Sequence, residues 1–281
     1  MSRTYDVAIA GATGAVGEAL LQILEEREFP VGRLFPLASE RSVDRTVRFR
    51  GEDLRVEVLD DFDFGQVQLG LFSAGGSVSE RIVPRAVEAG AVVIDNTSRF
   101  RYDEEVPLVV PECNAERIAD YTRRGIIANP NCSTIQMVVA CKPIQDAVGI
   151  DRINVATYQS VSGAGRQSME QLTEQSRAIL ANGETRTGVG AEKVVAFNAV
   201  PKIGPLLESG YTEEEMKMIW ETQKIFEDPS IMVNPTCVRV PVYLGHSEAV
   251  HLETRTKVTV QEVHGMLNSA PGVIVVDGDG P

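Results

Sequence analysis

The chain has 281 residues, of which 43% are hydrophobic and 24% are charged, and its formal net charge is −13. This length suits two domains with a sizeable core each, and the acidic balance argues against nucleic acid or an anionic membrane as the main partner. No apolar run approaches the roughly 20 residues that span a bilayer, and the polar start is unlike a signal peptide, so we expect a cytoplasmic protein.

The cysteines and histidines indicate neither a metal site nor a disulfide framework. Four cysteines and three histidines are present, and none of their spacings is typical of metal ligands or of a C-x-x-C pair. Reduced thiols and no structural metal are therefore expected.

The first 27 residues predict a dinucleotide-binding turn. Residues 5–10 (YDVAIA) are typical of a buried strand, the stretch GATGAVG at 11–17 follows directly, and residues 15–27 have helical periodicity. Glycines let the backbone approach phosphates, and the start of a helix stabilises their charge. The glycine motif alone is weak, but a strand before it and a helix after it favour this interpretation.

The next strand, predicted at 33–38, bears on the choice of cofactor. NAD sites commonly place an acidic residue after this strand to hold the ribose 2′-hydroxyl. Here Ser39, Arg41 and Ser42 offer hydroxyls and a guanidinium suited to a 2′-phosphate, with Glu40 as the discordant neighbour. The pattern favours NADP over NAD. The alternative is a charged turn before hairpin-like strands at 46–50 and 54–59.

Strand and helix continue to alternate, which predicts a doubly wound, mostly parallel sheet. Strands are expected at 67–72 and 91–94, with a helix at 78–89 between them. Ligands of such sheets bind at the carboxyl ends of strands, where the small-residue loop at 73–77 lies. Arg101 follows the strand at 91–94 and suits a phosphate or carboxylate, although a solvated loop arginine is an equal alternative.

Cys132 stands at a strand-to-helix turn. The stretch NPNCSTIQ at 129–136 follows a short apolar strand at 125–128 and precedes an apolar helical run from residue 135. Near a helix N-terminus, unpaired N–H groups and the helix dipole lower a thiol pKa, so Cys132 is a candidate nucleophile. The alternative is a cysteine that only packs in the core.

The second half of the chain predicts a different arrangement. A strand at 153–161 ends in the turn SGAG, and a helix is expected at about 167–181. A capping box at Thr212 opens a helix that continues to about residue 226 and places Glu214 and Lys217 three apart. On this pattern alone the pair would be a surface ion pair.

The last segments predict more sheet. Strands are expected at 236–242 and 245–254, a capping box at Thr259 opens a short helix, and another strand is expected at 272–276. The strand at 245–254 carries His246, and a single histidine on a strand is more often structural than catalytic.

Taken together, the chain resembles the aspartate-β-semialdehyde dehydrogenase family from Tyr5 to its last residue. The resemblance depends on the order and spacing of GATGAVG, ASERS, NTSRFR, VPLVVPECN, NPNCSTIQ, YQSVSGAG, YTEEEMKMIWETQKI and RVPVYLGHSEAV. It implies an α/β fold, with an NADP-binding Rossmann-type doubly wound parallel sheet at 1–130 and an α+β catalytic and dimerisation domain at 131–281.

The same resemblance implies a homodimeric enzyme that uses NADPH. The family reduces β-aspartyl phosphate to aspartate β-semialdehyde and releases inorganic phosphate, a step in lysine, methionine and threonine biosynthesis. Cys132 matches the nucleophile that forms a thioester, His246 the acid/base, and Gln159 the residue that orients the acyl group.

Further residues match the family's binding groups. Arg239 matches the arginine on the substrate α-carboxylate, Glu214 matches the acid on its ammonium, and the phosphate side is matched by Arg101, Asn131 and Lys217. Cofactor-binding residues are expected at Gly11, Thr13, Gly14, Ala15, Val16, Ser39, Arg41, Ser42, Ser73, Ala74, Gly75, Ser162 and Gly163.

The chain also departs from the family pattern, and two alternatives remain open. After ASERS the family usually continues with small residues and lysine, whereas here Val43-Asp44-Arg45 follows. Family members continue past the position that matches Pro281, with a segment that returns to the first domain. A non-catalytic truncated paralogue or fragment is therefore one alternative. N-acetylglutamyl-phosphate reductase is the other, and Glu214 argues against it because an acylated amine has no charge to pair.

Overall fold

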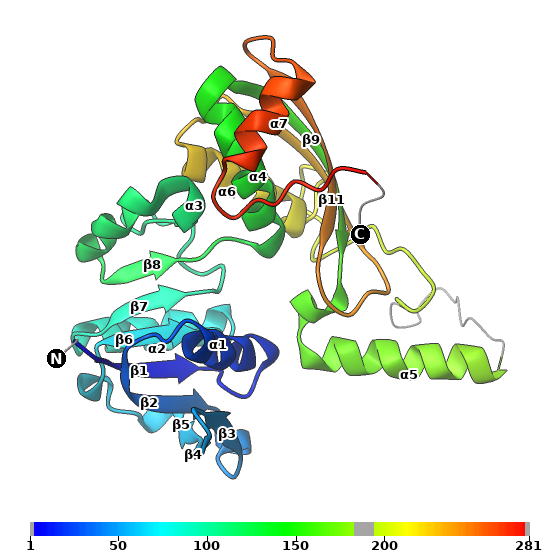
Figure 1. The fold of residues 1–281 in the computed structure, drawn as a ribbon. Helices are drawn as coiled ribbons and strands as arrows, with labels where there is room; N and C mark the ends of the chain where they lie inside the picture. The colour runs from blue at the N-terminus through cyan, green and yellow to red at the C-terminus, as the bar shows by residue number, and fades with distance from the viewer. Residues whose placement is uncertain (1–2, 183–193, 279–281) are drawn as a thin grey trace. The chain divides into compact units, whose positions relative to one another are not determined.

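The computed structural model describes residues 3–182 and 194–278, and the chain forms two compact units (Figure 1). The first unit comprises residues 1–109 and 115–130, and the second comprises residues 110–114 and 131–281. Residues 110–114 therefore belong with the second unit, whereas the expected boundary after residue 130 assigns them to the first.

A six-stranded sheet forms the first unit. Its order is β5-β2-β1-β6-β7-β8, and every pair of neighbours is parallel. Because the order runs outward from β1 in both directions, this is the doubly wound sheet that the sequence predicts. The strands are β1 (Tyr5–Ala10), β2 (Val31–Ala38), β5 (Glu57–Val58), β6 (Leu69–Phe72), β7 (Val92–Asp95) and β8 (Ile126–Ala128).

Helices connect these strands and bury their apolar faces on the sheet. α1 (Ala15–Glu26) follows β1, and α2 (Gly76–Glu88) follows β6. Val7 and Ile9 of β1 are buried in one cluster with Leu21 of α1. The short helix α3 (Pro111–Asn114) and a 3₁₀ segment (Ala115–Arg123) precede β8.

The expected hairpin forms, but its second strand is shorter than predicted. β3 (Thr46–Phe49) pairs antiparallel with β4 (Glu52–Arg55). The prediction of one strand over 54–59 is wrong, because Val56 turns into the core and the chain then joins β2 as β5. Residues 54–58 therefore contribute to two sheets, first as the end of β4 and then as β5.

The second unit has a mixed three-stranded sheet in the order β10-β9-β11. β9 (Ile150–Gln159) pairs in parallel with β10 (Met232–Arg239) and antiparallel with β11 (Ser247–Thr254). α4 (Cys132–Val148) and α6 (Glu213–Phe226) contact one face of this sheet. Their shared core includes Met137, Ile144, Ile153, Met218 and Ile231.

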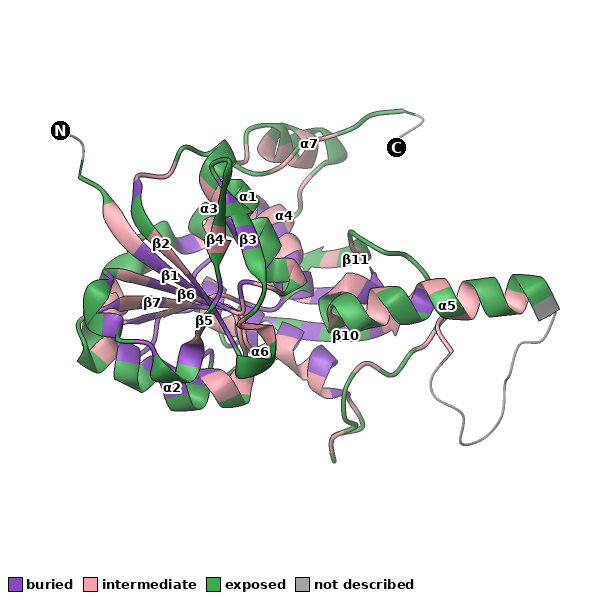
Figure 2. Cartoon of the chain, turned by 90° about the horizontal axis from the view of Figure 1, so that it is seen from below, coloured by how far each residue is buried: buried purple, intermediate pink, exposed green. Residues whose placement is uncertain are grey.

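Two further helices complete the second unit. α5 (Arg166–Asn182) follows the 3₁₀ turn Val161–Ala164, and Leu172 is the buried residue among its described side chains (Figure 2). α7 (Val260–Asn268) begins at the predicted capping box of Thr259 and contacts α4.

The strand predicted at 272–276 is absent: residues 273–277 are irregular. Ile274 is 89% exposed, and no described strand pairs with this segment. β-branched residues favour a strand only when a partner and a packed face are supplied. Within the described ranges, no helix is long and apolar enough to cross a membrane.

Candidate active site

Cys132 is the first residue of α4, three positions earlier than the predicted helical run begins. Asn131 is the N-cap, and its Oδ1 accepts hydrogen bonds from the backbone N–H groups of Ser133 at 3.0 Å and Thr134 at 3.4 Å. The sulfur therefore lies at the positive end of a 17-residue helix, which stabilises a thiolate.

The other three cysteines have different surroundings. Burial raises the pKa of the thiols of Cys113, Cys141 and Cys237 to about 12. Cys132 is the exposed member of the four. Cys132 is therefore the best candidate for a nucleophilic thiol among the four cysteines.

His246 faces Cys132 from the turn that precedes β11. Its Nε2 lies 3.1 Å from Cys132 Sγ, although the two residues are 114 positions apart in the chain. The backbone N–H of Ser160 donates to Nδ1 at 3.0 Å and fixes the orientation of the ring. Burial lowers the pKa of His246 below 6.5, and the Arg239 charge lowers it further. At neutral pH the ring is uncharged and within proton-transfer distance of the sulfur.

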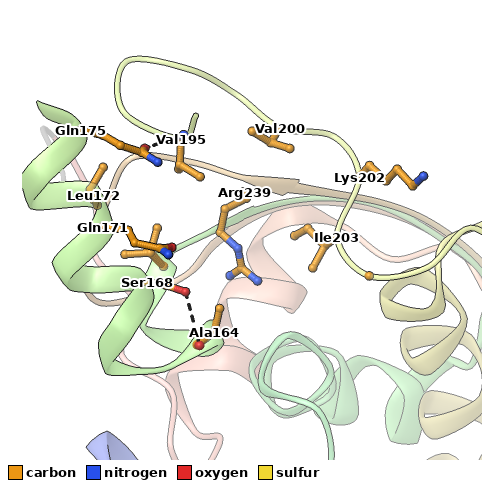
Figure 3. Close-up of a pocket in the computed structure, with 12 residues that line it drawn as sticks. Ala164, Ser168, Gln171, Leu172, Gln175, Val195, Val200, Lys202, Ile203 and Arg239 are labelled. Atoms are coloured by element: carbon orange, nitrogen blue, oxygen red, sulfur yellow. Dashed lines mark hydrogen bonds between the residues drawn. The ribbon is translucent and has the colours of Figure 1, made fainter. Parts of the chain in front are cut away.

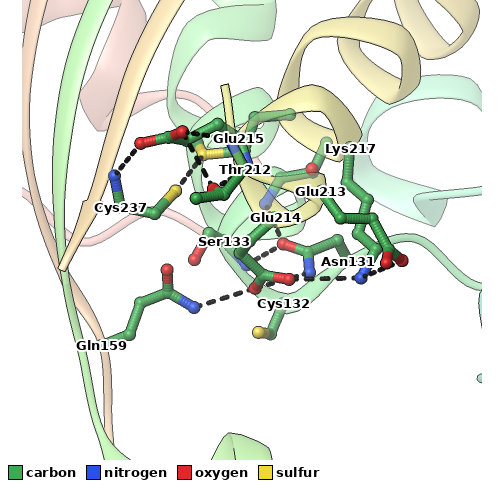
Figure 4. A network of polar contacts seen from close by, with 12 residues as sticks. Asn131, Cys132, Ser133, Gln159, Thr212, Glu213, Glu214, Glu215, Lys217 and Cys237 are labelled. Carbon is green, nitrogen blue, oxygen red and sulfur yellow. Dashed lines mark hydrogen bonds and ion pairs between the residues drawn. The ribbon is translucent and has the colours of Figure 1, made fainter. Parts of the chain in front are cut away.

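Glu214 joins two of the predicted site residues through one oxygen (Figure 4). The side-chain amides of Asn131 and Gln159 both donate to its Oε1 at 3.0 Å. Burial alone would raise the pKa of Glu214, but these hydrogen bonds and the Lys217 charge outweigh it and bring the pKa below 4.5. Glu214 is therefore an ionised, largely buried carboxylate.

Lys217, which is partly buried, forms an ion pair with Glu214. Its Nζ lies 3.3 Å from Glu214 Oε2 and 3.2 Å from Glu213 Oε1. Burial would lower the pKa of Lys217, but the Glu214 charge and the hydrogen bond to Glu213 raise it above 10.5. The pair is thus not the solvated surface pair that helix spacing alone indicates, and in this structure the two charges face each other.

Arg239, at the end of β10, lines a cavity. Its Nη1 donates to the Ser160 carbonyl oxygen at 2.5 Å. The cavity has a volume of about 230 Å³ and lies between α5, residues 195–204 and Arg239 (Figure 3). Lys202 also lines it. The guanidinium of Arg239 at this small cavity suits a ligand that carries a carboxylate.

Gly163 packs directly against these groups. A Cβ built on it would lie 3.4 Å from Arg239 Nη1 and 3.6 Å from His246 Nε2. Ser162 lies beside it, and its Oγ is 2.9 Å from Ser160 Oγ. The predicted pair of Ser162 and Gly163 is therefore adjacent to the candidate catalytic residues.

In the first unit, the three predicted cofactor loops lie on neighbouring parallel strands, so they meet at one edge of the sheet. Gly11 has φ +88°, and a Cβ on it would lie 2.8 Å from the Ser73 carbonyl oxygen. A Cβ on Gly17, which the sequence prediction leaves out, would lie 2.3 Å from the Gly11 carbonyl oxygen. The loops are the stretch from Gly11 through Thr13, Gly14 and Ala15 to Val16, the turn of Ser39, Arg41 and Ser42, and the turn of Ser73, Ala74 and Gly75.

These loops have the features that a dinucleotide needs. The backbone at Gly11 approaches its neighbours too closely for a side chain, and the start of α1 after Gly14 presents a helix N-terminus. Ser39 and Arg41 are exposed at the end of β2. A phosphate-bearing group therefore fits this edge of the sheet.

Arg101 also belongs to the first unit. It is 6% exposed, and its Nη2 donates to the Asn96 carbonyl oxygen at 2.9 Å. Asp95 orders the preceding loop by accepting hydrogen bonds from Ser79 Oγ and the Thr97 backbone N–H. In the two described stretches, no group of three or more His, Cys, Asp or Glu residues could hold a metal ion.

The sequence prediction missed three residues that shape these sites: Ser160, Gly17 and Glu221. Ser160 orients His246 through its backbone N–H, and Glu221 accepts the Asn131 backbone N–H at 2.6 Å. A backbone donor leaves no side-chain signal in a sequence, and a helical glutamate is normally interpreted as a surface residue. Gly17 was visible as the third glycine of the GATGAVG stretch.

Comparison with known proteins identifies two family matches. The semialdehyde dehydrogenase NAD binding domain matches residues 6–121, and the semialdehyde dehydrogenase dimerisation domain matches residues 141–281. Aspartate-semialdehyde dehydrogenase 2 of Vibrio cholerae is 58% identical over 278 residues, which cover 99% of this chain and 82% of that protein. Aspartate-semialdehyde dehydrogenase of Legionella pneumophila is 60% identical over 277 residues, covering 99% and 80%.

Solved structures agree with the sequence comparison. The crystal structure of Vibrio cholerae aspartate semialdehyde dehydrogenase II complexed with ASA has a TM-score of 0.95 to this chain. The match has 58% sequence identity and covers 99% of this chain and 82% of that one.

Proposed function

This chain belongs to the aspartate-semialdehyde dehydrogenase family, and from that premise we propose that it reduces β-aspartyl phosphate with NADPH through a thioester on Cys132. The products are aspartate β-semialdehyde, NADP and inorganic phosphate. The observation that carries the proposal is the 3.1 Å contact between Cys132 Sγ and His246 Nε2 at the start of α4.

The acyl transfer would use the second unit. The Cys132 thiolate attacks the acyl carbon of β-aspartyl phosphate, a carbon–sulfur bond forms, and phosphate leaves with the electrons of the carbon–oxygen bond. Gln159 orients the acyl group, and His246 exchanges the proton with sulfur and then with the product oxygen. The lowered pKa of His246 supports this role, because it leaves the ring uncharged at neutral pH.

Substrate recognition would divide between two charges. Arg239, at the cavity, takes the α-carboxylate, and the ionised Glu214 takes the ammonium. Lys217, Asn131 and Arg101 serve the phosphate side. To bind phosphate, Lys217 has to exchange at least one of its present partners for it, because the carboxylates of Glu213 and Glu214 both lie within 3.3 Å of Lys217 Nζ.

The cofactor would be held at the carboxyl edge of the first sheet, and when bound it supplies the hydride for the thioester carbon. The glycine loop from Gly11 to Val16 and the turn at Ser73–Gly75 would hold the phosphates. Ser39, Arg41 and Ser42 would bind a 2′-phosphate, which is why we propose NADP instead of NAD. Ser162 and Gly163 would line the nicotinamide side.

We also propose that the protein is a homodimer built through the second unit. The match of residues 141–281 to a dimerisation domain supports this. The face of the three-stranded sheet opposite α4 and α6 supports it as well, since Tyr158, Met232 and Ala249 are exposed there.

The alternatives are less well supported. A non-catalytic relative has no need to keep Cys132, Gln159, Arg239 and His246, and all four are present here. N-acetylglutamyl phosphate has no charged amine for Glu214, which is ionised in this structure.

The test is NADPH formation from aspartate semialdehyde, NADP and phosphate by the purified chain. We expect turnover that depends on phosphate and is lost in Cys132→Ala. The wild type should be slower with NAD than with NADP, and Arg41→Ala should be slower than the wild type with NADP. Turnover that survives Cys132→Ala would contradict the thioester. Folded protein that shows no turnover under any of these conditions would contradict the activity.

A further inference from the structure

Glu221 is a fully buried glutamate on α6 that no step of the proposed mechanism uses. Its Oε2 accepts a hydrogen bond from the backbone N–H of Asn131 at 2.6 Å, across 90 positions of the chain. This distance is short for an N–H donor. A buried carboxylate is costly unless such bonds offset the loss of water, so its presence here calls for a specific role.

Asn131, the partner of Glu221, is held at both ends by one helix. Glu221 binds its backbone N–H, and Glu214 accepts from its side-chain Nδ2 at 3.0 Å. The two glutamates lie two turns apart on α6, so both point from the same side of that helix. Asn131 is itself only 6% exposed.

The residue held in this way determines where the sulfur lies. Asn131 is the N-cap of α4, and its Oδ1 caps the N–H groups of Ser133 and Thr134. Cys132 follows directly, and its Sγ must remain 3.1 Å from His246 Nε2. The Asn131 carbonyl oxygen accepts the backbone N–H of Ile135 at 2.9 Å within α4, so the bond to Glu221 fixes the other end of the same backbone unit, where the chain enters the helix.

We propose that Glu221 is a positioning residue for the Cys132 nucleophile, acting by the reach of its carboxylate oxygen to the Asn131 backbone N–H. The inference rests on the proposed function only in that Cys132 is the nucleophile. Removing the oxygen leaves a buried N–H without an acceptor, and the turn relaxes to recover one. The sulfur then leaves its alignment with His246.

Three substitutions of Glu221 distinguish the position of its side-chain oxygen from the need for a carboxyl group. Glu221→Gln keeps an oxygen at the same distance but replaces the carboxyl group by an amide. Glu221→Asp keeps the carboxyl group but withdraws its oxygens by one methylene, and Glu221→Met removes the polar group. A misplacement of about 1 Å can cost about 100-fold in rate, so kcat is expected to fall about 100-fold in Glu221→Asp and Glu221→Met. Glu221→Gln is expected to stay within about tenfold of the wild type, and KM for aspartate semialdehyde within about threefold in all of them.

A second readout does not depend on turnover. The rate of Cys132 alkylation by iodoacetamide is measured for each variant, with Cys132→Ala as the blank. It is expected to fall in Glu221→Asp and Glu221→Met and to be largely kept in Glu221→Gln. Thr222→Val is the matched control, because Thr222 is the next residue of α6 and is also fully buried.

The outcomes distinguish the possibilities. A merely structural role would lower kcat in Thr222→Val and Glu221→Gln as much as in Glu221→Asp, which would overturn the proposal. Loss in Glu221→Gln with activity kept in Glu221→Asp would also overturn it, because the carboxyl group would then matter and the reach of its oxygen would not. If Glu221→Met does not fold, the Gln and Asp variants alone decide. If the wild type shows no dehydrogenase activity, the proposed function fails while the alkylation rates still test Glu221.

Discussion

Two neighbouring charges of opposite sign, as well as burial, shift the pKa of His246. Arg239 lowers the pKa of His246, in the same direction as burial, whereas the Glu214 carboxylate and a hydrogen bond with Gly245 raise it. The balance lies below 6.5. His246 therefore gains its charge only in acid, which leaves it free to exchange a proton with Cys132 at neutral pH.

The pKa of His246 is expected to respond to these two neighbours in opposite directions. Arg239→Met removes a positive charge and should move the titration midpoint of the ring to higher pH. Glu214→Gln removes a negative charge and should move it to lower pH. NMR titration of the three histidine rings, with His246→Asn for assignment, measures this. Equal midpoints in the two variants would contradict the electrostatic account.

Glu248, on β11, is a second partly buried titratable group and lies outside the proposed catalytic set. Burial raises the pKa of Glu248 to about 7, against the opposing hydrogen bond from Gln136. Because this pKa lies above the ordinary value of 4.5, the folded chain holds a proton that the unfolded chain has lost between these two values. The contribution of Glu248 to stability is therefore complete below about pH 4.5 and is lost as pH rises through about 7.

Glu248→Gln is expected to remove this pH dependence. Between pH 4.5 and pH 8, the free energy of unfolding of the wild type should fall relative to that of the variant by roughly 3 kcal/mol. Urea unfolding of both proteins at the two pH values measures the difference, and His246 cancels because both proteins contain it. A constant difference across the range would show that Glu248 ionises normally.

The sequence proposes residues for the site, but it does not give their hydrogen-bond partners. The structure brings Cys132, His246, Gln159, Asn131 and Glu214 together within one unit. Spacing along α6 alone would have assigned Glu214 and Lys217 to solvent. Ser160 acts through its own backbone N–H, and Glu221 acts on the backbone N–H of Asn131. Every residue type except proline has such a group, so the side-chain pattern gives no sign of these two bonds.

At the scale of elements, α6 supplies the carboxylates that shape the site. Its N-terminus has a complete capping box, in which Thr212 Oγ1 accepts from the Glu215 backbone N–H and the Glu215 carboxylate accepts from the Thr212 backbone N–H. Glu215 also accepts from the Cys237 backbone N–H at 3.1 Å, which ties this cap to β10. The start of α6 is therefore fixed to the sheet.

Thr212→Ala is expected to destabilise the protein by about 1 to 2 kcal/mol, since it removes a cap whose oxygen is buried. Thr259→Ala is the matched control, because Thr259 forms the same capping box on α7 but is exposed. Its cost should be about 0.5 kcal/mol, with activity unchanged. Urea unfolding and the dehydrogenase assay measure both, and equal losses in the two variants would contradict a special role for α6.

Periodicity predicted the existence of elements better than their pairing. The capping boxes at Thr212 and Thr259 and the strand at Tyr5–Ala10 are present where the sequence places them. The strand predicted at 272–276 failed because strand propensity does not provide a neighbouring strand. The prediction of one strand at 54–59 failed because the local sequence pattern does not reveal that the chain leaves the hairpin at Val56 and joins another sheet.

At the scale of the whole molecule, the sheet of the second unit has one packed face and one exposed face. Tyr158 is 46% exposed in β9 and Met232 is 49% exposed in β10. These two side chains lie at opposite ends of the face, with the polar residues Asn154 and Asn234 between them, so the face is mixed in polarity. With the match to a dimerisation domain, this is the surface that we expect to be buried in the dimer.

Light scattering on the purified protein is expected to give about twice the 30.6 kDa of one chain. Tyr158→Arg should shift the mass toward one chain, because it places a charge on the proposed interface. Ile23→Arg is the control, since Ile23 is similarly exposed, at 43%, on α1 of the first unit. A wild-type monomer at micromolar concentration would contradict the homodimer, and an intact dimer of Tyr158→Arg would move the interface elsewhere.

The order in which the second sheet is assembled has a consequence for the newly made protein. β9 pairs with β10 and β11, and Arg152 meets Met232 only after 80 further residues have been synthesised. His246 follows Cys132 by 114 residues, which at about 5 to 20 residues per second takes roughly 6 to 23 seconds of translation. α6 begins at Glu213, so for most of that interval α4 lacks the helix against which it packs. The thiol of Cys132 and the apolar side chains of α4 are therefore accessible to chaperones and oxidants for several seconds before His246 has been synthesised.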